Sequence, residues 1–297
     1  MKKDLHPGPV NIMIAGTQKA ATSSLQRYMG EHPDVITHPA LEFTYFVLED
    51  EWKQGYEKRY RHQFGDHIDN SKKIMAKNVG IMYFEHALQH LKEHNPNVKI
   101  IIVLRNPVDR AYSAYWYARW RGHETVESFD EALHADPSRA DTFVSRGIID
   151  YLGRGEYAKQ LDMVYKYFDK SQVLIIFQED MKKDMKNIMK RVFEFSGLDS
   201  SFVPNLEKKY NESSRSIFPK ISRWLRSENS PIKSILKSVI SPRLLTKAKY
   251  KVSSLNSALY SPPPMNPKTR QYLIDYYKPH NEKLEKIVGR DLSSWNQ

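Results

Sequence analysis

The chain has 297 residues, 40% of them hydrophobic and 27% charged, which is the composition of an ordinary globular protein. It contains no cysteine, and this excludes disulfides, thiolate metal sites and a cysteine nucleophile. The net charge of +11 favours polyanionic ligands or partners.

No apolar run approaches the length that a membrane-spanning helix needs. The N-terminus, MKKDLHPGPV, lacks the apolar region of a signal peptide. Together with the missing cysteines, these features predict a soluble protein in a reducing, cytoplasmic setting.

The elements predicted before residue 95 alternate between strand and helix. The first strand, VNIMIAG, is a short apolar run between Pro9 and Gly16, and the helix after it has Thr22 or Ser23 as its N-cap. The predicted elements of this part are strand 10–16, helix 22–31, strand 72–77 and helix 83–94. The stretch 42–64 is rich in aromatic residues and is not assigned to an element.

The alternation continues through residue 196. The run VKIIIVL, 98–104, is the clearest buried strand, and Pro107 suits the first position of the next helix. The later elements are helices 107–122, 126–134 and 154–168, strand 173–177 and helix 180–196. This order predicts an α/β fold of three layers: a mainly parallel central sheet, helices on both faces and a P-loop-like phosphate-binding loop. We expect one domain over 1–297.

The remaining residues differ in composition. Residues 208–251 carry twelve Lys or Arg and two Glu, so a net charge of +10 is concentrated there. Prolines interrupt 216–256, which we interpret as a basic helical insertion or an acceptor-side segment, and a last helix is predicted over 266–288. Such a surface suits phosphates, an acidic acceptor or an anionic membrane, and no recognised nucleic-acid motif is present.

The first candidate site is the loop GTQKAATSS, 16–24, after the first strand. A helix N-terminus offers unpaired backbone N–H groups and a partial positive charge, which suit a phosphate. Lys19 adds a full charge. No glycine precedes Lys19 directly and Thr22 follows only three residues later, so this is not a Walker A loop. Taken alone, the loop is equally well a plain strand–turn–helix with a solvated lysine.

The second candidate site follows the strand 98–104. Arg105 stands at its carboxyl end, where a planar guanidinium suits a phosphate, and Ser113 lies two turns along the next helix. Separately, Arg105 would pair with Asp109 and Ser113 would be a surface hydroxyl. Because ligands of parallel sheets bind beyond the carboxyl ends of strands, the two sites together predict a ligand with phosphates at both ends.

In this order and spacing, the two motifs resemble the 5′-phosphosulfate and 3′-phosphate loops of sulfotransferases that use 3′-phosphoadenosine 5′-phosphosulfate (PAPS). The stretch EFTYF, 42–46, is similar to the Glu-x-His-Phe-Phe of the heparan-sulfate (glycosaminoglycan-type) branch. RGEY, 154–157, and the ending 272–295 resemble that branch's Arg-Gly-x-Tyr segment and its closing helix with Trp. The resemblance covers nearly the whole chain.

The resemblance implies a sulfotransferase that moves a sulfuryl group by in-line displacement to a hydroxyl or amine, with 3′-phosphoadenosine 5′-phosphate as product and no metal. Glu42 would be the general base, and Lys19 would stabilise charge on the leaving phosphate. The acceptor would be a small molecule or a saccharide, and an acidic one suits the basic surface. The implied donor-binding residues are Gln18, Lys19, Ala20, Ala21, Thr22, Ser23, Ser24, Arg105 and Ser113.

The sequence departs from the branch at several positions. Ala20 and Ala21 replace the usual glycines of the loop, and Leu41 replaces a lysine of many relatives. The stretch 77–80 echoes the branch's Glu-Lys-Thr-Pro only loosely, so no role is transferred to Lys77. These 297 residues contain no apolar run that could serve as the membrane anchor of the Golgi members and no cysteine for their disulfide.

Two other functions stay open. A P-loop small-molecule kinase would need a Mg²⁺-binding acid at a strand end, and Glu179 and Asp180 follow the strand 173–177. A non-catalytic polyanion-binding protein would use 208–251, and in a weaker version 216–256 would make a peripheral contact with an anionic membrane. No specific nucleic-acid partner is expected.

Overall fold

The computed structural model of the protein describes residues 6–136, 138, 142–207, 214–216, 257–259 and 262–297. Contacts group the chain into two compact units. The first comprises 1–110, 154–210 and 273–297, and the second comprises 111–153 and 211–272. The organisation of 1–297 as a single sulfotransferase-like domain stays a prediction.

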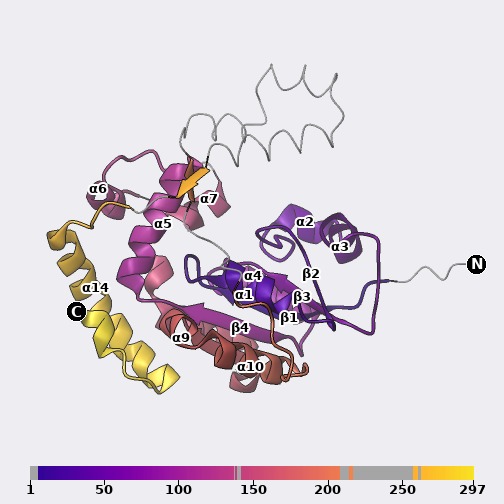
Figure 1. The fold of residues 1–297 in the computed structure, drawn as a ribbon. Coiled ribbons are helices and arrows are strands. Elements are labelled where there is room, and N and C mark those ends of the chain that lie inside the picture. The colour runs from indigo at the N-terminus through magenta and orange to yellow at the C-terminus, as the bar shows by residue number, and fades with distance from the viewer. Residues whose placement is uncertain (1–5, 137, 139–141, 208–213, 217–256, 260–261) are drawn as a thin grey trace, which may run out of the picture. The chain divides into compact units, whose positions relative to one another are not determined.

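The first unit is built on a five-stranded sheet in which every pairing is parallel (Figure 1). Its strands, in the order β2-β3-β1-β4-β5 across the sheet, are β1 (Val10–Gly16), β2 (Val35–Thr37), β3 (Lys73–Lys77), β4 (Lys99–Leu104) and β5 (Val173–Phe177). From β1 the chain runs to the β2 edge and back to β3, and then crosses to β4 on the other side of β1. The strand order therefore reverses between β1 and β4, which is where open α/β sheets bind ligands.

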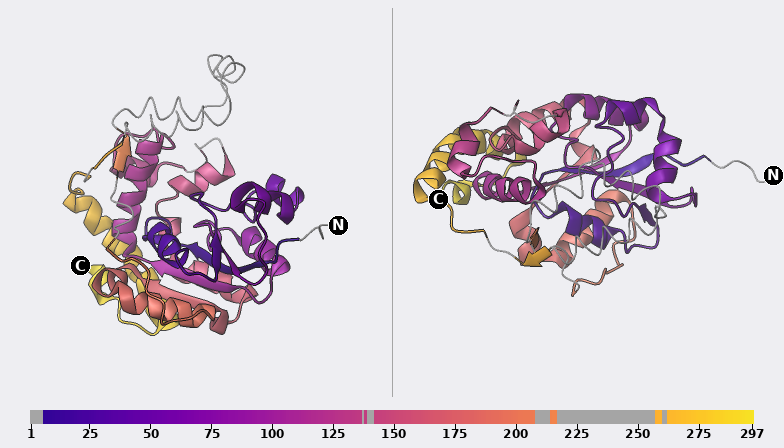
Figure 2. Two further views of the ribbon diagram at one scale, coloured as in Figure 1. Left: turned by 45° about the vertical axis from the view of Figure 1, so that its right-hand side comes forward. Right: turned by 90° about the horizontal axis from the view of Figure 1, so that it is seen from above.

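Helices cover both faces of this sheet, so the predicted three-layer α/β fold is confirmed (Figure 2). Helices α1, α9 and α10 pack on one face, and α4 and α8 pack together on the other. The helices of the first unit are α1 (Thr22–Met29), α2 (Glu49–Lys53), α3 (Tyr56–Phe64), α4 (Glu85–His94), α8 (Tyr157–Tyr167), α9 (Gln178–Lys183) and α10 (Met185–Ser196). Both α5 (Pro107–Arg121) and α14 (Pro267–Val288) contribute residues to each unit.

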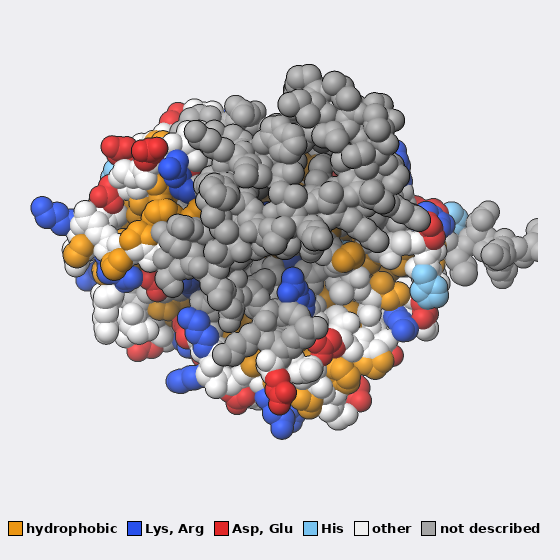
Figure 3. Space-filling model, turned by 45° about the horizontal axis from the view of Figure 1, so that its top comes forward, with side chains coloured by type: hydrophobic (Ala, Val, Ile, Leu, Met, Phe, Trp, Pro, Cys, Tyr) orange, Lys and Arg blue, Asp and Glu red, His pale blue; other side chains and the backbone are white. Residues whose placement is uncertain are grey.

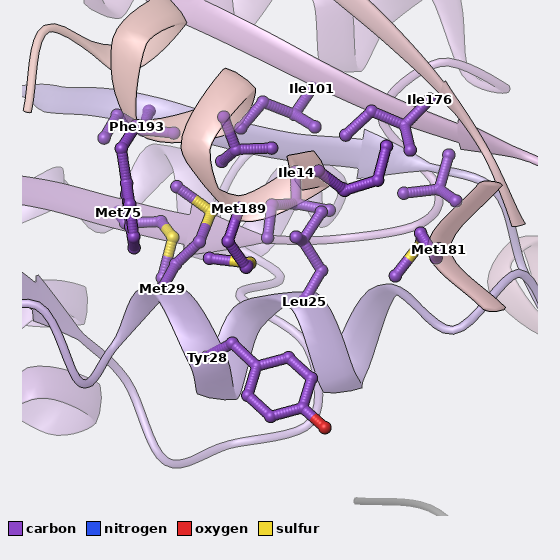
Figure 4. Close-up of a cluster of buried hydrophobic side chains, with 14 of the residues drawn as sticks. Ile14, Leu25, Tyr28, Met29, Met75, Ile101, Ile176, Met181, Met189 and Phe193 are labelled. Atoms are coloured by element: carbon purple, nitrogen blue, oxygen red, sulfur yellow. The ribbon is translucent and has the colours of Figure 1, made fainter. Parts of the chain in front are cut away.

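Figure 4 shows the apolar layer between the sheet and α1 with α10. Alternate residues of β1 point into it, as its strand geometry requires, and Ile14 meets Leu25 of α1 and Ile101 of β4 there. Met29, Met75 and Met189 also lie in this layer. Each fully buried side chain of this size contributes about 1.5–3 kcal/mol to folding, so the layer fixes the strand ends that carry the site.

Element boundaries differ from the prediction where capping chemistry decides them. The predicted helix 180–196 is two helices, because Asp184 leaves the helical path and its carboxylate accepts the Asn187 N–H at 3.0 Å as an N-cap. The predicted N-cap at Thr22 or Ser23 is wrong: the N-cap is Ala21, in a left-handed conformation and without a side-chain cap.

The second unit contains α6 (Phe129–His134), α7 (Phe143–Ile149) and an antiparallel pair, β6 (Ser214–Ser216) and β7 (Ser257–Leu259). The buried carboxylate of Glu124 organises the turn after α5. It accepts the Tyr151 hydroxyl and the N–H groups of Thr125 and Val126, each at 2.9 Å. These three donors stabilise the buried carboxylate.

The basic stretch predicted at 216–256 lies outside the described residues except for Ser216. Among the described residues that Figure 3 shows on one face, acidic and basic side chains are interspersed. Within the described ranges, no helix combines the length and the apolar character that crossing a bilayer requires.

Candidate functional site

The loop between β1 and α1 has a strained backbone. Thr17 anchors its start, since both its N–H and its hydroxyl donate to the Val103 carbonyl at 2.9 Å. Lys19 and Ala21 then adopt left-handed φ angles of 69° and 65°. Each costs about 1–2 kcal/mol for a residue with a Cβ, and strain of this kind gathers at functional sites.

The same loop has the polar groups of an anion site. Thr22 and Ser24 are buried and Ser23 is half-buried at the start of α1, where the first backbone N–H groups have no intrahelical acceptor. Gln18 is also buried, and its Oε1 has no hydrogen-bond partner among the described residues. An orphaned buried polar atom costs about 1–3 kcal/mol. The N–H groups and hydroxyls of the loop therefore fit an anionic ligand, whereas the Gln18 Oε1 is an acceptor and needs a donor as its partner.

Arg105, in the second predicted site, contacts the loop of the first predicted site. Its guanidinium Nη1 donates to the Lys19 carbonyl at 2.9 Å, although the two residues are 86 positions apart. Burial lowers the pKa of Arg105 and nearby Asp109 opposes this, so the group keeps its charge. Ser113 lies half-buried on α5 in the second unit, and its joint action with Arg105 stays a prediction.

Glu42 lies beside the end of β3, held by two donors. Its Oε1 is 2.6 Å from the Lys77 ammonium, and its Oε2 accepts the Val79 N–H at 2.9 Å. The Lys77 side chain is 1% exposed, whereas the Glu42 side chain is 26% exposed. The carboxylate therefore meets solvent on one side and a buried positive charge on the other.

The turn at 77–80 fixes the backbone around Glu42 as well. Asn78 donates to the Phe43 carbonyl at 3.0 Å and accepts the Gly80 N–H at 2.8 Å, while the Phe43 N–H donates to the Lys77 carbonyl at 2.7 Å. No role was assigned to Lys77 from the sequence. A signal was present: a lysine that ends the apolar run IMA of a buried strand requires a carboxylate partner.

His38 supports the turn from the sheet side. Its Nε2 accepts the Lys77 N–H at 3.1 Å, so the neutral ring carries its proton on Nδ1. Burial, together with the charges of Lys77 and Arg59, lowers the pKa of His38 to about 4. Burial also lowers the pKa of His94 to about 4, and its Nε2 accepts the Val10 N–H at 3.0 Å.

These two histidines predict acid lability. Between pH 6.5 and about 4 the unfolded chain binds their protons and the native state does not. The free energy of unfolding should therefore decrease as the pH is lowered through this window, by up to roughly 3 kcal/mol per histidine. Urea unfolding at pH 7.5 and pH 5 measures the loss. His38→Gln keeps an acceptor and should lose part of this sensitivity; an unchanged pH dependence in the variant would contradict the assignment to His38.

The acidic end of β5 is occupied by the C-terminus of the same unit. Arg290 forms a two-point ion pair with Asp180, and the Trp295 indole N–H donates to Glu179 at 3.0 Å. The Arg290 guanidinium also lies 4.0 Å from the ring centroid of Phe177. These carboxylates serve the packing of the chain end, which removes the observation that favoured a kinase.

The fold and the site define a class of α/β protein. Its cationic loop after β1 contacts a guanidinium at the end of β4, and a carboxylate lies beside the end of β3. Such sites serve transfer of anionic groups, in which positioning and charge stabilisation dominate. The chain belongs to the sulfotransferase domain family, which it matches over residues 9–222.

Two heparan sulfate enzymes are similar to this chain over nearly all of its length. The chain is 28% identical to bifunctional heparan sulfate N-deacetylase/N-sulfotransferase 4 of Mus musculus. It is 27% identical to bifunctional heparan sulfate N-deacetylase/N-sulfotransferase 3 of Homo sapiens. Each match covers 96% of this chain and 31% of the relative. The chain thus spans about a third of the length of each relative. The crystal structure of a sulfotransferase from Alicyclobacillus acidocaldarius has the same fold, with a TM-score of 0.69 and 24% identity over 99% of this chain and 100% of that one.

The predicted family and the prediction of a sulfotransferase enzyme are confirmed. The predicted cytoplasmic setting is wrong: besides the heparan sulfate enzymes, the chain matches the membrane-associated sulfotransferase kil1 of Dictyostelium discoideum, at 22% identity over 96% of this chain and 66% of that relative. The inference failed because a chain without cysteine has no thiol to oxidise and is compatible with either redox compartment.

Proposed function

We propose that the chain transfers a sulfuryl group from PAPS to an amine or hydroxyl of a saccharide. One observation carries this: the Lys19 loop and Arg105 contact each other at neighbouring strand ends of the unit that also holds the Glu42 carboxylate. The names of the heparan sulfate N-sulfotransferases support a saccharide acceptor.

The donor would be held by groups already oriented for an anion. PAPS, when bound, supplies the sulfuryl group and leaves as 3′-phosphoadenosine 5′-phosphate. Lys19 and the first turn of α1 would hold the 5′ end, and Lys19 would neutralise charge on the departing phosphate. Arg105 has donors left for a 3′ phosphate, because a guanidinium has five N–H groups and the Lys19 carbonyl is a single acceptor. Ser113 would add a hydroxyl to this second phosphate.

Glu42 would take the acceptor's proton. Its partly exposed carboxylate can meet an incoming hydroxyl or amine, while Lys77 and the Val79 N–H restrict its orientation. A correctly held base contributes about 10²–10⁴-fold to such a step. Lys77 is buried behind it and acts through Glu42 in this proposal.

Ligand-dependent thermal stability tests the donor. Adenosine 3′,5′-bisphosphate should raise the melting temperature, because a ligand at 100 times its Kd stabilises the native state by about 2.7 kcal/mol. ATP with Mg²⁺ at the same concentration should give a much smaller shift. Equal shifts, or a larger shift with ATP and Mg²⁺, would contradict the proposed donor.

A further inference from the structure

The proposed function leaves the segment 154–157, RGEY, without a role. It joins a 3₁₀ turn (Gly153–Gly155) to the start of α8, and three of its four residues are buried. A Cβ at Gly155 would lie 2.5 Å from the Tyr277 hydroxyl, so only glycine fits between the segment and α14. The backbone is therefore held in place, and the side chains of Arg154 and Tyr157 project from a fixed support.

Arg154 contacts the turn that holds Glu42. Its Nη1 donates to the Val79 carbonyl at 3.1 Å, and its guanidinium lies 4.4 Å from the ring centroid of Tyr83. The N–H of the same Val79 donates to Glu42. Arg154 thus holds Val79 in place, and the Val79 N–H orients one oxygen of Glu42, the proposed base. A stacked, buried guanidinium has little rotamer freedom, which makes it a rigid support.

Tyr157 contacts the donor side. Its hydroxyl donates to the Arg105 carbonyl at 2.9 Å and lies beside the Thr17 side chain. Arg105 in turn holds the Lys19 carbonyl, and Thr17 starts the loop. Tyr157 is 1% exposed, so its hydroxyl has no bulk water as an alternative partner.

We propose that Arg154 and Tyr157 are positioning residues that act on the two halves of the reaction separately. Arg154 orients Glu42 through Val79, and Tyr157 orients Arg105 and the loop that would bind the donor. The inference rests on the proposed function. In this proposal the segment 154–157 aligns the base Glu42 with the loop that would bind the donor. This alignment must hold to within about 1 Å for efficient transfer.

The test measures kcat and the Kd for adenosine 3′,5′-bisphosphate in each variant, because the two substitutions should change different constants. Arg154→Met should lower kcat at saturating donor by about 10–100-fold and leave the Kd for adenosine 3′,5′-bisphosphate within about threefold, since no donor contact changes. Tyr157→Phe should raise that Kd by about five- to tenfold, the effect of one lost hydrogen bond, and leave kcat nearly unchanged. Arg154→Lys keeps the charge and should recover part of the lost turnover; it also replaces Arg154→Met if that variant does not fold.

Matched controls separate positioning from general stability. Tyr60 is buried and its hydroxyl donates to the His67 carbonyl at 3.2 Å, so Tyr60→Phe removes a similar bond elsewhere and should change neither constant. Parallel changes of kcat and Kd in both variants, or no change in either, would overturn the inference while leaving the proposed function intact. A wild-type protein that does not bind the bisphosphate would overturn both.

Discussion

Glu42→Gln should lower turnover by about 10²–10⁴-fold and leave the affinity for adenosine 3′,5′-bisphosphate within about threefold. Glutamine keeps the size of the side chain and an oxygen for the Val79 N–H, but it cannot take a proton from the acceptor. Initial rates of sulfate transfer to a heparan-type saccharide, together with calorimetric titration of the bisphosphate, measure the two quantities.

Glu51→Gln is the matched control for this change. Glu51 is also a partly buried carboxylate in an ion pair, 3.0 Å from Arg59, and it is distant in the chain from every candidate site residue except Glu42. Its substitution should leave turnover within about threefold of wild type. Full activity in Glu42→Gln would remove Glu42 as the base. Equal losses in both variants would show that the effect is structural.

The same substitution should also lower stability. In Glu42→Gln the Lys77 ammonium, 1% exposed, faces a neutral amide in place of a carboxylate. Removing one partner of a fully buried ion pair costs about 3–5 kcal/mol, and the partial exposure of Glu42 reduces this to about 1–3 kcal/mol. Turnover must therefore be measured at a temperature at which the variant is folded, as its urea unfolding curve establishes.

The strands, and the strand ends at which the two candidate anion sites lie, could be predicted because their determinants are local. VNIMIAG, VKIIIVL and VLIIF are apolar runs with clear ends, and each is a strand at nearly the predicted residues. The loop after β1 and Arg105 after β4 follow from those ends. β2 was not predicted because a three-residue strand, VIT, gives no usable pattern. Helices α2 and α3 were not predicted because both lie in the aromatic stretch 42–64, which has no clear periodicity.

The contacts that make the site depend on sheet register and could not be predicted. Glu42 and Lys77 are 35 residues apart, and they meet because the segment that holds Glu42 is bonded to the end of β3, where the Phe43 N–H donates to the Lys77 carbonyl. The left-handed Ala21 was equally hidden, since an alanine gives no sign of a conformation that glycine normally adopts. The sequence pattern placed the strand ends, and the packing of the sheet decided which side chains meet there.

Lys77→Met should lower turnover by about 10–100-fold, because Glu42 would lose the charge that holds one of its oxygens and would sample unproductive orientations. Stability should change much less than in Glu42→Gln, since methionine fills the buried space and Glu42 keeps both the Val79 N–H and solvent. Lys73→Met, on the same strand and half-buried, is the control and should retain full turnover.

The double variant Glu42→Gln with Lys77→Met tests whether the two residues act as a pair. Replacing both partners of a buried pair removes the unpaired charge, so the double variant should regain most of the stability that Glu42→Gln loses. Its turnover should be no lower than that of Glu42→Gln alone, because Lys77 has nothing left to position. A further loss of turnover in the double variant would mean that Lys77 contacts the reacting groups directly. Additive losses of stability would mean that the 2.6 Å contact does not couple the two side chains in solution.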